Sequence, residues 1–424
     1  MRARGKLICA TKLAIALVLV ASPGLSQEFG EYSLFEPTDF PETTGANIHA
    51  GGLSVHPFIK FGIEYDDNIY TKPEDEVDDV IMSIGAGLTL DRESGDNRFQ
   101  AGYELLALQH DENGDEDRID HTLFANVHWG LAESFAIKLS EQFVKTSGEE
   151  DDAGIDLLDQ INNVAGVGVS YDHNRLSFEV AYLNVIDKYD DLEESDRMDQ
   201  QITLTGGYYV LPKTKVLLEL ARGWVDFDES VISDADYYQA RIGVSGELTS
   251  KISGVAKVGY QSRDYDEDTP EDFDGLVAYV NLTAALSDRT KLVLDAERDL
   301  VASTFFDSAY YTSSSVGLTL EQKIFNKWTA SLSAGYQEED YPSDVTLQVG
   351  SATFWAFPFG FVDVPINQTD KRKDEILTAG AELTYHIRDW ASLSLAYDYK
   401  NSDSNFRAFD YDDNRVSLTL SLTF

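Results

Sequence analysis

The chain has 424 residues, of which 75 are acidic and 33 are basic, giving a formal net charge of −42. Such acidity repels the phosphates of nucleic acids, so we expect no nucleic-acid partner. Hydrophobic residues make up 43% and aromatic residues 12% of the chain, which opposes an intrinsically disordered protein.

The first 26 residues have the pattern of a Sec signal peptide. Arg2, Lys6 and other basic residues precede the apolar run 13–21, and Gly24 and Ser26 place small residues just before a cut at Gln27. The single cysteine, Cys9, lies in this peptide, so we predict neither a disulfide nor a thiolate metal site. Residues 27–54 then form a periplasmic extension with little regular structure.

From residue 55 onward, short stretches alternate apolar residues with polar or small ones. In the last stretch the apolar residues from Val416 to Phe424 share one face, and the intervening Ser and Thr residues share the other. No later apolar run reaches the roughly 18–20 residues that a membrane helix needs. If the chain enters a membrane, it must do so as a closed barrel, because lipid does not tolerate open sheet edges.

The links between these stretches alternate in length. Short links such as 172–174, 249–251 and 388–389 carry turn residues, whereas links such as 110–118, 264–272 and 339–374 are long. Short periplasmic turns and long outer loops are typical of outer-membrane barrels. We therefore predict that residues 55–424 form one antiparallel, up-and-down transmembrane β-barrel of about 18 strands in the outer membrane of a Gram-negative cell.

Aromatic residues cluster at both ends of the outward faces, where they predict two interfacial girdles in contact with lipid and lipopolysaccharide. The terminal Phe424, preceded by alternating leucines, is similar to the C-terminal signal that barrel-assembly machinery recognises.

Charged residues recur on the inward faces, where unpaired burial would cost several kcal/mol, so the interior is expected to be wet. Two interpretations stay open: ion pairs that stabilise the wall, or a net-acidic conduit that prefers cations. The predicted pore-lining residues are Lys60, Glu64, Glu104, Lys138, Glu179, Glu219, Arg241, Glu247, Lys257, Lys291, Asp295, Glu297, Glu321, Glu382 and Asp398.

The long links carry most of the acidic residues. They form either a solvated, self-repelling surface or a site for divalent cations that bridge to lipopolysaccharide. Asp111, Asn113 and Asp115 match the start of an EF-hand loop, but Glu116 occupies the position that needs Gly. We therefore predict no EF-hand metal site and no cofactor.

The link 339–374 is too apolar in its middle for a free outer loop. We predict that it folds into the lumen as a constriction or caps the mouth; a hairpin in contact with lipid is the alternative. The residues expected in this constriction or cap are Phe354, Trp355, Phe357, Phe359 and Phe361.

The run from Tyr65 to Tyr70, Tyr-Asp-Asp-Asn-Ile-Tyr, is followed by an acidic link into Asp79-Val80-Ile81. This block resembles the start of the outer-membrane family described as "putative β-barrel porin 2", and the resemblance covers roughly residues 55–424. It implies an outer-membrane barrel, and relatives often accompany exopolysaccharide export machinery.

The sequence thus favours a transport function as a porin-like channel. The family resemblance further suggests the conduit for an exported polysaccharide, with a periplasmic polysaccharide-export protein as partner. The alternative is a structural or adhesive surface protein. An enzyme is not expected, because none of the histidines has a Ser or Asp partner in a defensible catalytic pattern. We predict no catalytic residues.

Overall fold

The computed structural model describes residues 48–50, 52–150, 157–190, 195–228, 232–266, 272–303, 308–356 and 360–424. The predicted signal peptide and most of the predicted extension 27–54 lie outside these residues, as do Phe357 and Phe359.

The described residues form nineteen strands in one sheet and two short 3₁₀-helices, η1 (Gly114–Glu116) and η3 (Arg407–Phe409). They contain no helix long and apolar enough to cross a membrane. The strands are β1 (Ile48–Ala50), β2 (Leu53–Asp66), β3 (Asp79–Ser94), β4 (Asn97–His110), β5 (Arg118–Ala132), β6 (Phe135–Glu150), β7 (Leu157–His173), β8 (Leu176–Tyr189), β9 (Arg197–Leu211), β10 (Thr214–Phe227), β11 (Ala235–Glu247), β12 (Ile252–Tyr265), β13 (Phe273–Ser287), β14 (Thr290–Ala302), β15 (Tyr310–Ile324), β16 (Trp328–Ala356), β17 (Gly360–Arg388), β18 (Ala391–Ser404) and β19 (Tyr411–Thr423).

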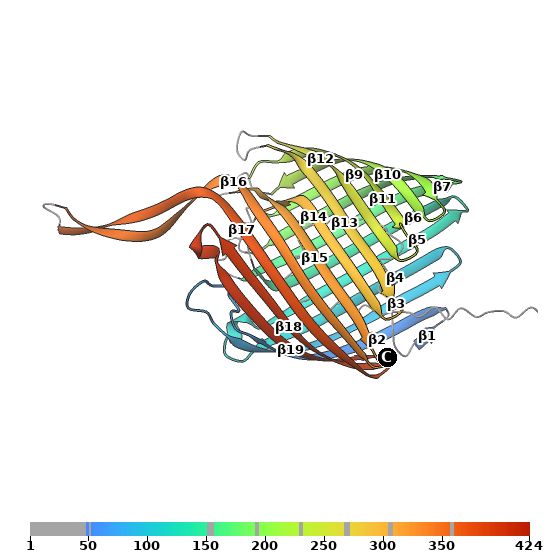
Figure 1. Cartoon of the computed structure of the whole chain (residues 1–424), viewed down its shortest axis with the longest axis horizontal. Coiled ribbons are helices and arrows are strands. Elements are labelled where there is room, and N and C mark those ends of the chain that lie inside the picture. Colours follow the sequence, from blue (N-terminus) through green and yellow to red (C-terminus); the bar gives the residue numbers. More distant parts are fainter. Residues whose placement is uncertain are drawn as a thin grey trace, which may run out of the picture.

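Strands β2 to β19 close into a barrel (Figure 1). Each strand pairs antiparallel with the next along the chain, and β19 pairs with β2 from Arg415↔Asp66 to Thr423↔Phe58. The prediction of an antiparallel barrel of about 18 strands is therefore confirmed in the described residues. The short strand β1 adds three residue pairs to the beginning of β2, on the end of the barrel where the C-terminus also lies.

The two faces of the wall differ as the alternation predicts. Outward positions carry exposed apolar side chains, such as Ile84, Ile242 and Leu332, the last of which is 55% exposed. Inward positions of the same strands carry polar groups such as Gln239 and Arg241, which are buried. A wall with apolar side chains outside and polar ones inside suits lipid on one face and water on the other.

The Tyr-Asp-Asp-Asn-Ile-Tyr block stabilises the barrel seam, which is the junction between β2 and β19 where the barrel closes. Asp67 accepts hydrogen bonds from the backbone N–H of Asn414 (2.7 Å) and from its side-chain amide (2.9 Å). Asn68 is almost fully buried and donates to the carbonyl of Asp412 at 3.0 Å. Arg415 lies between Asp66 and Asp413, with Nε 3.4 Å and 2.6 Å from their carboxylate oxygens. These contacts join the first barrel strand to the last.

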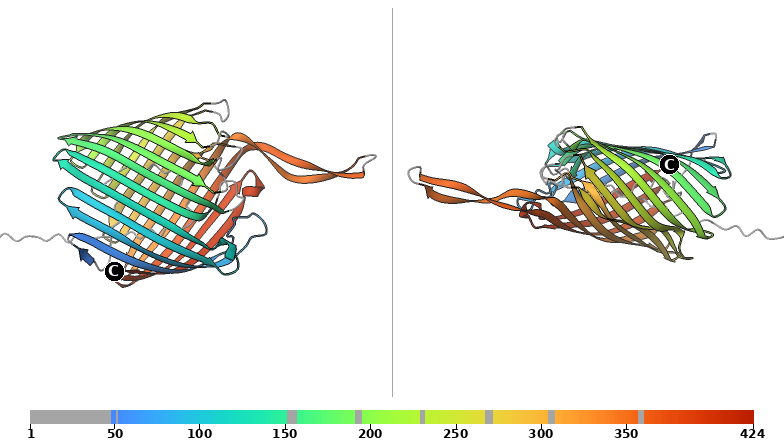
Figure 2. Two further views of the ribbon diagram at one scale, coloured as in Figure 1. Left: turned by 180° about the vertical axis from the view of Figure 1, so that it is seen from behind. Right: turned by 90° about the horizontal axis from the view of Figure 1, so that it is seen from above.

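The structure corrects the prediction for link 339–374. Most of it is not a loop, because β16 and β17 have 29 residues each and stay paired up to Ala356↔Gly360. The base of the resulting hairpin is buried at Tyr341 and Val345. Beyond this base the hairpin extends away from the barrel and does not enter the lumen (Figures 1 and 2). Its two strands satisfy each other's backbone hydrogen bonds there. Phe354, Trp355 and Phe361 belong to its strands, and their side chains lie outside the described residues.

We expect Leu332→Arg to harm folding far more than Ser333→Arg. The two positions are adjacent on β16, but Leu332 faces lipid, where an arginine costs ~2–4 kcal/mol near the bilayer midplane. The measurement is the yield of folded barrel in liposomes, read from its heat-dependent mobility in gels. Equal yields would contradict the assignment of the two faces.

Loss of the seam contacts should weaken the barrel. Asp67→Ala leaves two donors of Asn414 without their acceptor, which is expected to cost about 1–3 kcal/mol. The folded band should therefore convert to the unfolded one at a lower temperature. Asp78→Ala is the control, because Asp78 makes an exposed contact with Tyr65 (3.2 Å) and should leave that temperature unchanged.

Candidate functional site in the barrel lumen

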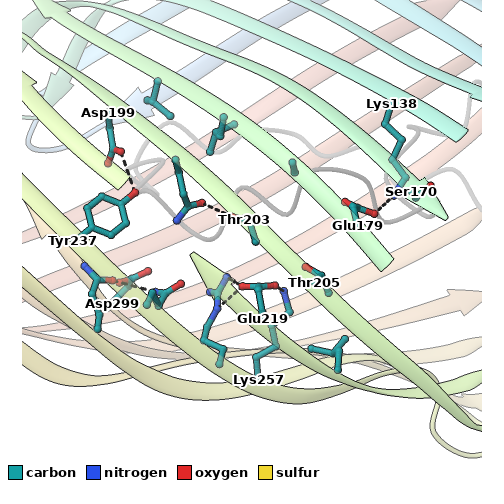
Figure 3. Close-up of a pocket in the computed structure, with 18 of the residues that line it drawn as sticks. Lys138, Ser170, Glu179, Asp199, Thr203, Thr205, Glu219, Tyr237, Lys257 and Asp299 are labelled. Carbon is teal, nitrogen blue, oxygen red and sulfur yellow. Dashed lines mark hydrogen bonds and ion pairs between the residues drawn. The ribbon is translucent and has the colours of Figure 1, made fainter. Parts of the chain in front are cut away.

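A cavity of about 310 Å³ lies inside the barrel, against the inner faces of β5 to β12 and the end of β14 (Figure 3). Period-two alternation brings its lining together, because every second side chain of each strand points to the lumen. The lining mixes charged groups with amides, hydroxyls and a few aliphatic side chains, such as Gln201, Thr203 and Leu217.

Five of the predicted pore-lining residues line this cavity, and they form two ion-paired groups. Lys138 of β6 donates to Glu179 of β8 at 2.6 Å. Glu219 of β10, only 5% exposed, accepts a hydrogen bond from Arg241 Nε at 2.7 Å and another from Lys257 at 3.1 Å. The sequence placed these residues on inward faces, and the strand register makes them neighbours.

The carboxylate of Glu219 binds two positively charged side chains from different strands, Arg241 of β11 and Lys257 of β12. Without it, the positive charges of Arg241 and Lys257 would face each other in a buried setting, which is costly. A cross-strand pairing of this kind fixes the positions of the side chains that face the cavity.

The sequence analysis missed a further group of charged residues, which lies at the outer end of the cavity. The hydroxyl of Tyr237 donates to Asp199 at 3.0 Å, and the guanidinium of Arg263 lies 4.8 Å from the Tyr237 ring centroid. Nearby, Arg197 pairs with the fully buried Asp187 at 2.8 Å. Continuing the period-two pattern to the strand ends would have placed these residues inward, because Arg263 follows Lys257 by six positions and Asp199 precedes Thr205 by six.

The remaining predicted residues lie elsewhere on the wall. Lys60 donates to Glu104 at 2.6 Å, Asp295 accepts from Asn281 at 2.6 Å, and Glu382 accepts from Thr384 at 2.6 Å. The structure pairs Lys291 in register with Glu321, Asp398 with Arg415, Glu64 with Ser417, and Glu297 with Ser315.

Glu247 differs from the prediction. It lies at the short-turn end of β11, where it is exposed and contacts the exposed Lys213. Gly246, with φ of +108°, departs from regular strand backbone just before it. Glu247 therefore belongs to the rim of the barrel and not to the cavity.

Basic groups balance acidic ones around the cavity more evenly than the sequence suggested. The arginines that the sequence analysis missed, Arg197 and Arg263, line the cavity together with Asp199 and Asp299. The ion-pair interpretation of the inward charges thus describes this wall well, and the polar groups between the pairs give it the chemistry of a water-filled passage.

We expect Glu219→Gln to move ion selectivity toward anions. The change removes the negative charge that balances Arg241 and Lys257, so the cavity becomes more positive and concentrates anions. The cation-to-anion permeability ratio, from reversal potentials across a salt gradient, should fall by about twofold or more. Glu247→Gln at the rim is the matched control; an equal fall there would contradict a special role of the cavity.

Comparison with known proteins gives one family match. The family described as "Putative beta-barrel porin 2" matches residues 41–424. A search of curated protein sequences gives no match.

The solved structures to which this chain is similar include the following three. OccAB3 from Acinetobacter baumannii has 11% identity and a TM-score of 0.45, with 88% of this chain and 100% of that chain covered. OpdK from Pseudomonas aeruginosa, solved with vanillate, has 12% identity and a TM-score of 0.44, with 87% and 99% covered. The siderophore receptor PirA from Pseudomonas aeruginosa has 9% identity and a TM-score of 0.40, with 87% and 80% covered.

Proposed function

Because the chain belongs to the putative beta-barrel porin 2 family of porin-like outer-membrane barrels, we propose that its lumen conducts hydrophilic solutes and, in the cell, an exported polysaccharide. The observation that carries this proposal is the set of paired charges, amides and hydroxyls around the inner cavity. A barrel without a passage could bury apolar side chains there at no electrostatic cost, whereas this wall keeps groups that hydrogen-bond to water or sugars.

The wall chemistry suits a polyhydroxylated solute. Sugar hydroxyls both donate and accept hydrogen bonds, and Gln201, Gln239 and Gln261 offer amides that do the same. Because Lys138 and Glu219 are held in ion pairs, their charges are partly neutralised, which lowers the attraction for small ions relative to neutral sugars.

The proposal extends to the route and the partners. Residues 1–26 would direct export and be removed, and residues 27–54 would remain in the periplasm. The pairing of β1 with β2 supports this, because it places the extension at the same end as the C-terminus, within reach of a periplasmic polysaccharide-export protein.

A structural or adhesive surface role is the second candidate. The hairpin of β16 and β17 favours it, since this hairpin extends far beyond the barrel at the end opposite the C-terminus (Figure 2). Such an arm could contact another surface without any transport through the lumen.

Single-channel recording in planar bilayers tests the two candidates. The channel proposal predicts discrete conductance steps, brief current blocks when a neutral oligosaccharide is added, and a preference for cations at low salt because of the acidic outer links. A correctly folded barrel that produces no conductance steps would contradict the channel and favour the surface role.

A further inference from the structure

The outer end of the β14–β15 hairpin leaves the barrel wall. β13 and β14 pair only as far as Ala278↔Arg298, although β13 continues to Phe273 and β14 to Ala302. Beyond Arg298, β14 pairs with β15 alone, up to Ala302↔Tyr310. The neighbouring end of β13 keeps its pairing with β12, up to Phe273↔Arg263. The wall is therefore split between β13 and β14 at this end.

Both faces of this hairpin end are buried, unlike those of a strand in a barrel wall, which exposes one face to lipid. Neighbouring residues on each strand point to opposite faces, and here both are buried: Leu300 and Val301 on β14, and Tyr310 and Tyr311 on β15. Each of these four residues is at most 6% exposed. In the same strand β15, the outward Leu318 is 46% exposed. The hairpin end must therefore be covered from two sides by other parts of the chain.

One face packs on the inner wall of the barrel. Leu300, Ala309 and Tyr310 share an apolar cluster with Val225, Ala235, Tyr237, Tyr265 and Phe273. The ring of Tyr310 stacks on Tyr265 with centroids 5.8 Å apart, and meets Phe273 edge to face at 6.1 Å. Tyr237 and Tyr265 lie on the inward face, because they share the parity of Arg241 and Lys257, which line the cavity.

The other face packs on the neighbouring strand β16 and on η3. Val301 and Tyr311 share a cluster with Tyr341 and Val345 of β16 and with Phe406 and Phe409 at η3. Tyr311 stacks on Tyr341 at 4.9 Å between centroids. The guanidinium of Arg372 lies 3.5 Å from the Phe409 ring centroid. The hairpin end is thus held between the inner wall of β10–β13 and the β16–η3 side.

This placement puts the hairpin directly at the cavity. Asp299, Leu300 and Ala302 of β14 are part of the cavity lining, together with groups of β9 to β12; Figure 3 shows Asp299 among them. These residues therefore lie beside the path of a solute that moves between the cavity and the outer end. Two aromatic clusters at that position narrow the path and exclude water from part of its cross-section.

We propose that the inward end of the β14–β15 hairpin is the size-determining constriction of this channel, with Leu300 facing the cavity and Tyr310 holding the hairpin against the inner wall. The proposal rests on the channel function proposed above and specifies where that channel is narrowest. It also moves the constriction from the link 339–374, where the sequence predicted it, to another pair of strands.

The experiment compares Tyr310→Ser with Tyr238→Ser in planar bilayers. Tyr238 is a matched control, because it neighbours Tyr237 at the same end of the barrel but points outward and is 50% exposed. Shortening Tyr310 removes the ring that stacks on Tyr265, so the hairpin should loosen, raise single-channel conductance about twofold or more and admit larger polyethylene glycols. Tyr238→Ser should match the unaltered protein. Leu300→Ser, on the other strand of the hairpin, is the second variant if Tyr310→Ser does not fold.

The outcomes separate the two proposals. If all folded variants conduct like the unaltered protein, the channel stands and the constriction is wrong. If no folded variant conducts, including those with a shortened hairpin side chain, both the channel and the constriction are wrong. If Tyr238→Ser raises conductance as much as Tyr310→Ser, the effect is not specific to the hairpin and the constriction is again wrong.

Discussion

Closure of the backbone hydrogen-bond ladder between β19 and β2 is the constraint on which the rest of this structure depends. In lipid an unpaired N–H or C=O group costs several kcal/mol, so a sheet survives there only without free edges. The seam carries extra bonds for this reason: Asp67 holds Asn414, and Asn68 bridges to Asp412. The Tyr-Asp-Asp-Asn-Ile-Tyr block, on which the family resemblance rests, thus has a structural role in closing the barrel.

Closure of the barrel also places charged side chains on its inner face, where they need partners or water. Every strand must send half of its side chains inward, and the acidic chain fills many of these positions with carboxylates. These carboxylates form ion pairs with basic side chains of other strands, as Glu179 does with Lys138. The carboxylate of Glu219 is shared by the side chains of Arg241 and Lys257. The result is a polar interior in which charges are fixed in place and amides and hydroxyls remain available to a solute.

Two hairpins depart from the regular wall, and they do so in opposite directions. The β16–β17 hairpin extends outward beyond its buried base, with its two strands hydrogen-bonded to each other. The β14–β15 hairpin parts from β13 and turns inward, where aromatic packing on both faces replaces the lost ladder. Backbone hydrogen bonds between its own strands stabilise the β16–β17 hairpin, whereas burial of apolar area stabilises the inward end of the β14–β15 hairpin.

The sequence by itself determined the barrel, its strand number and the inward side chains in the middle of the strands, because a period of two and alternating link lengths are local properties. At the strand ends it misplaced Glu247 and missed Arg263. It also placed Glu219, Arg241 and Lys257 on inward faces. Only the tertiary structure decided that these three meet, because register sets cross-strand neighbours. It also decided where the lumen narrows: aromatic residues such as Tyr310 read as ordinary strand residues until the split from β13 turns both faces of the hairpin toward other parts of the chain.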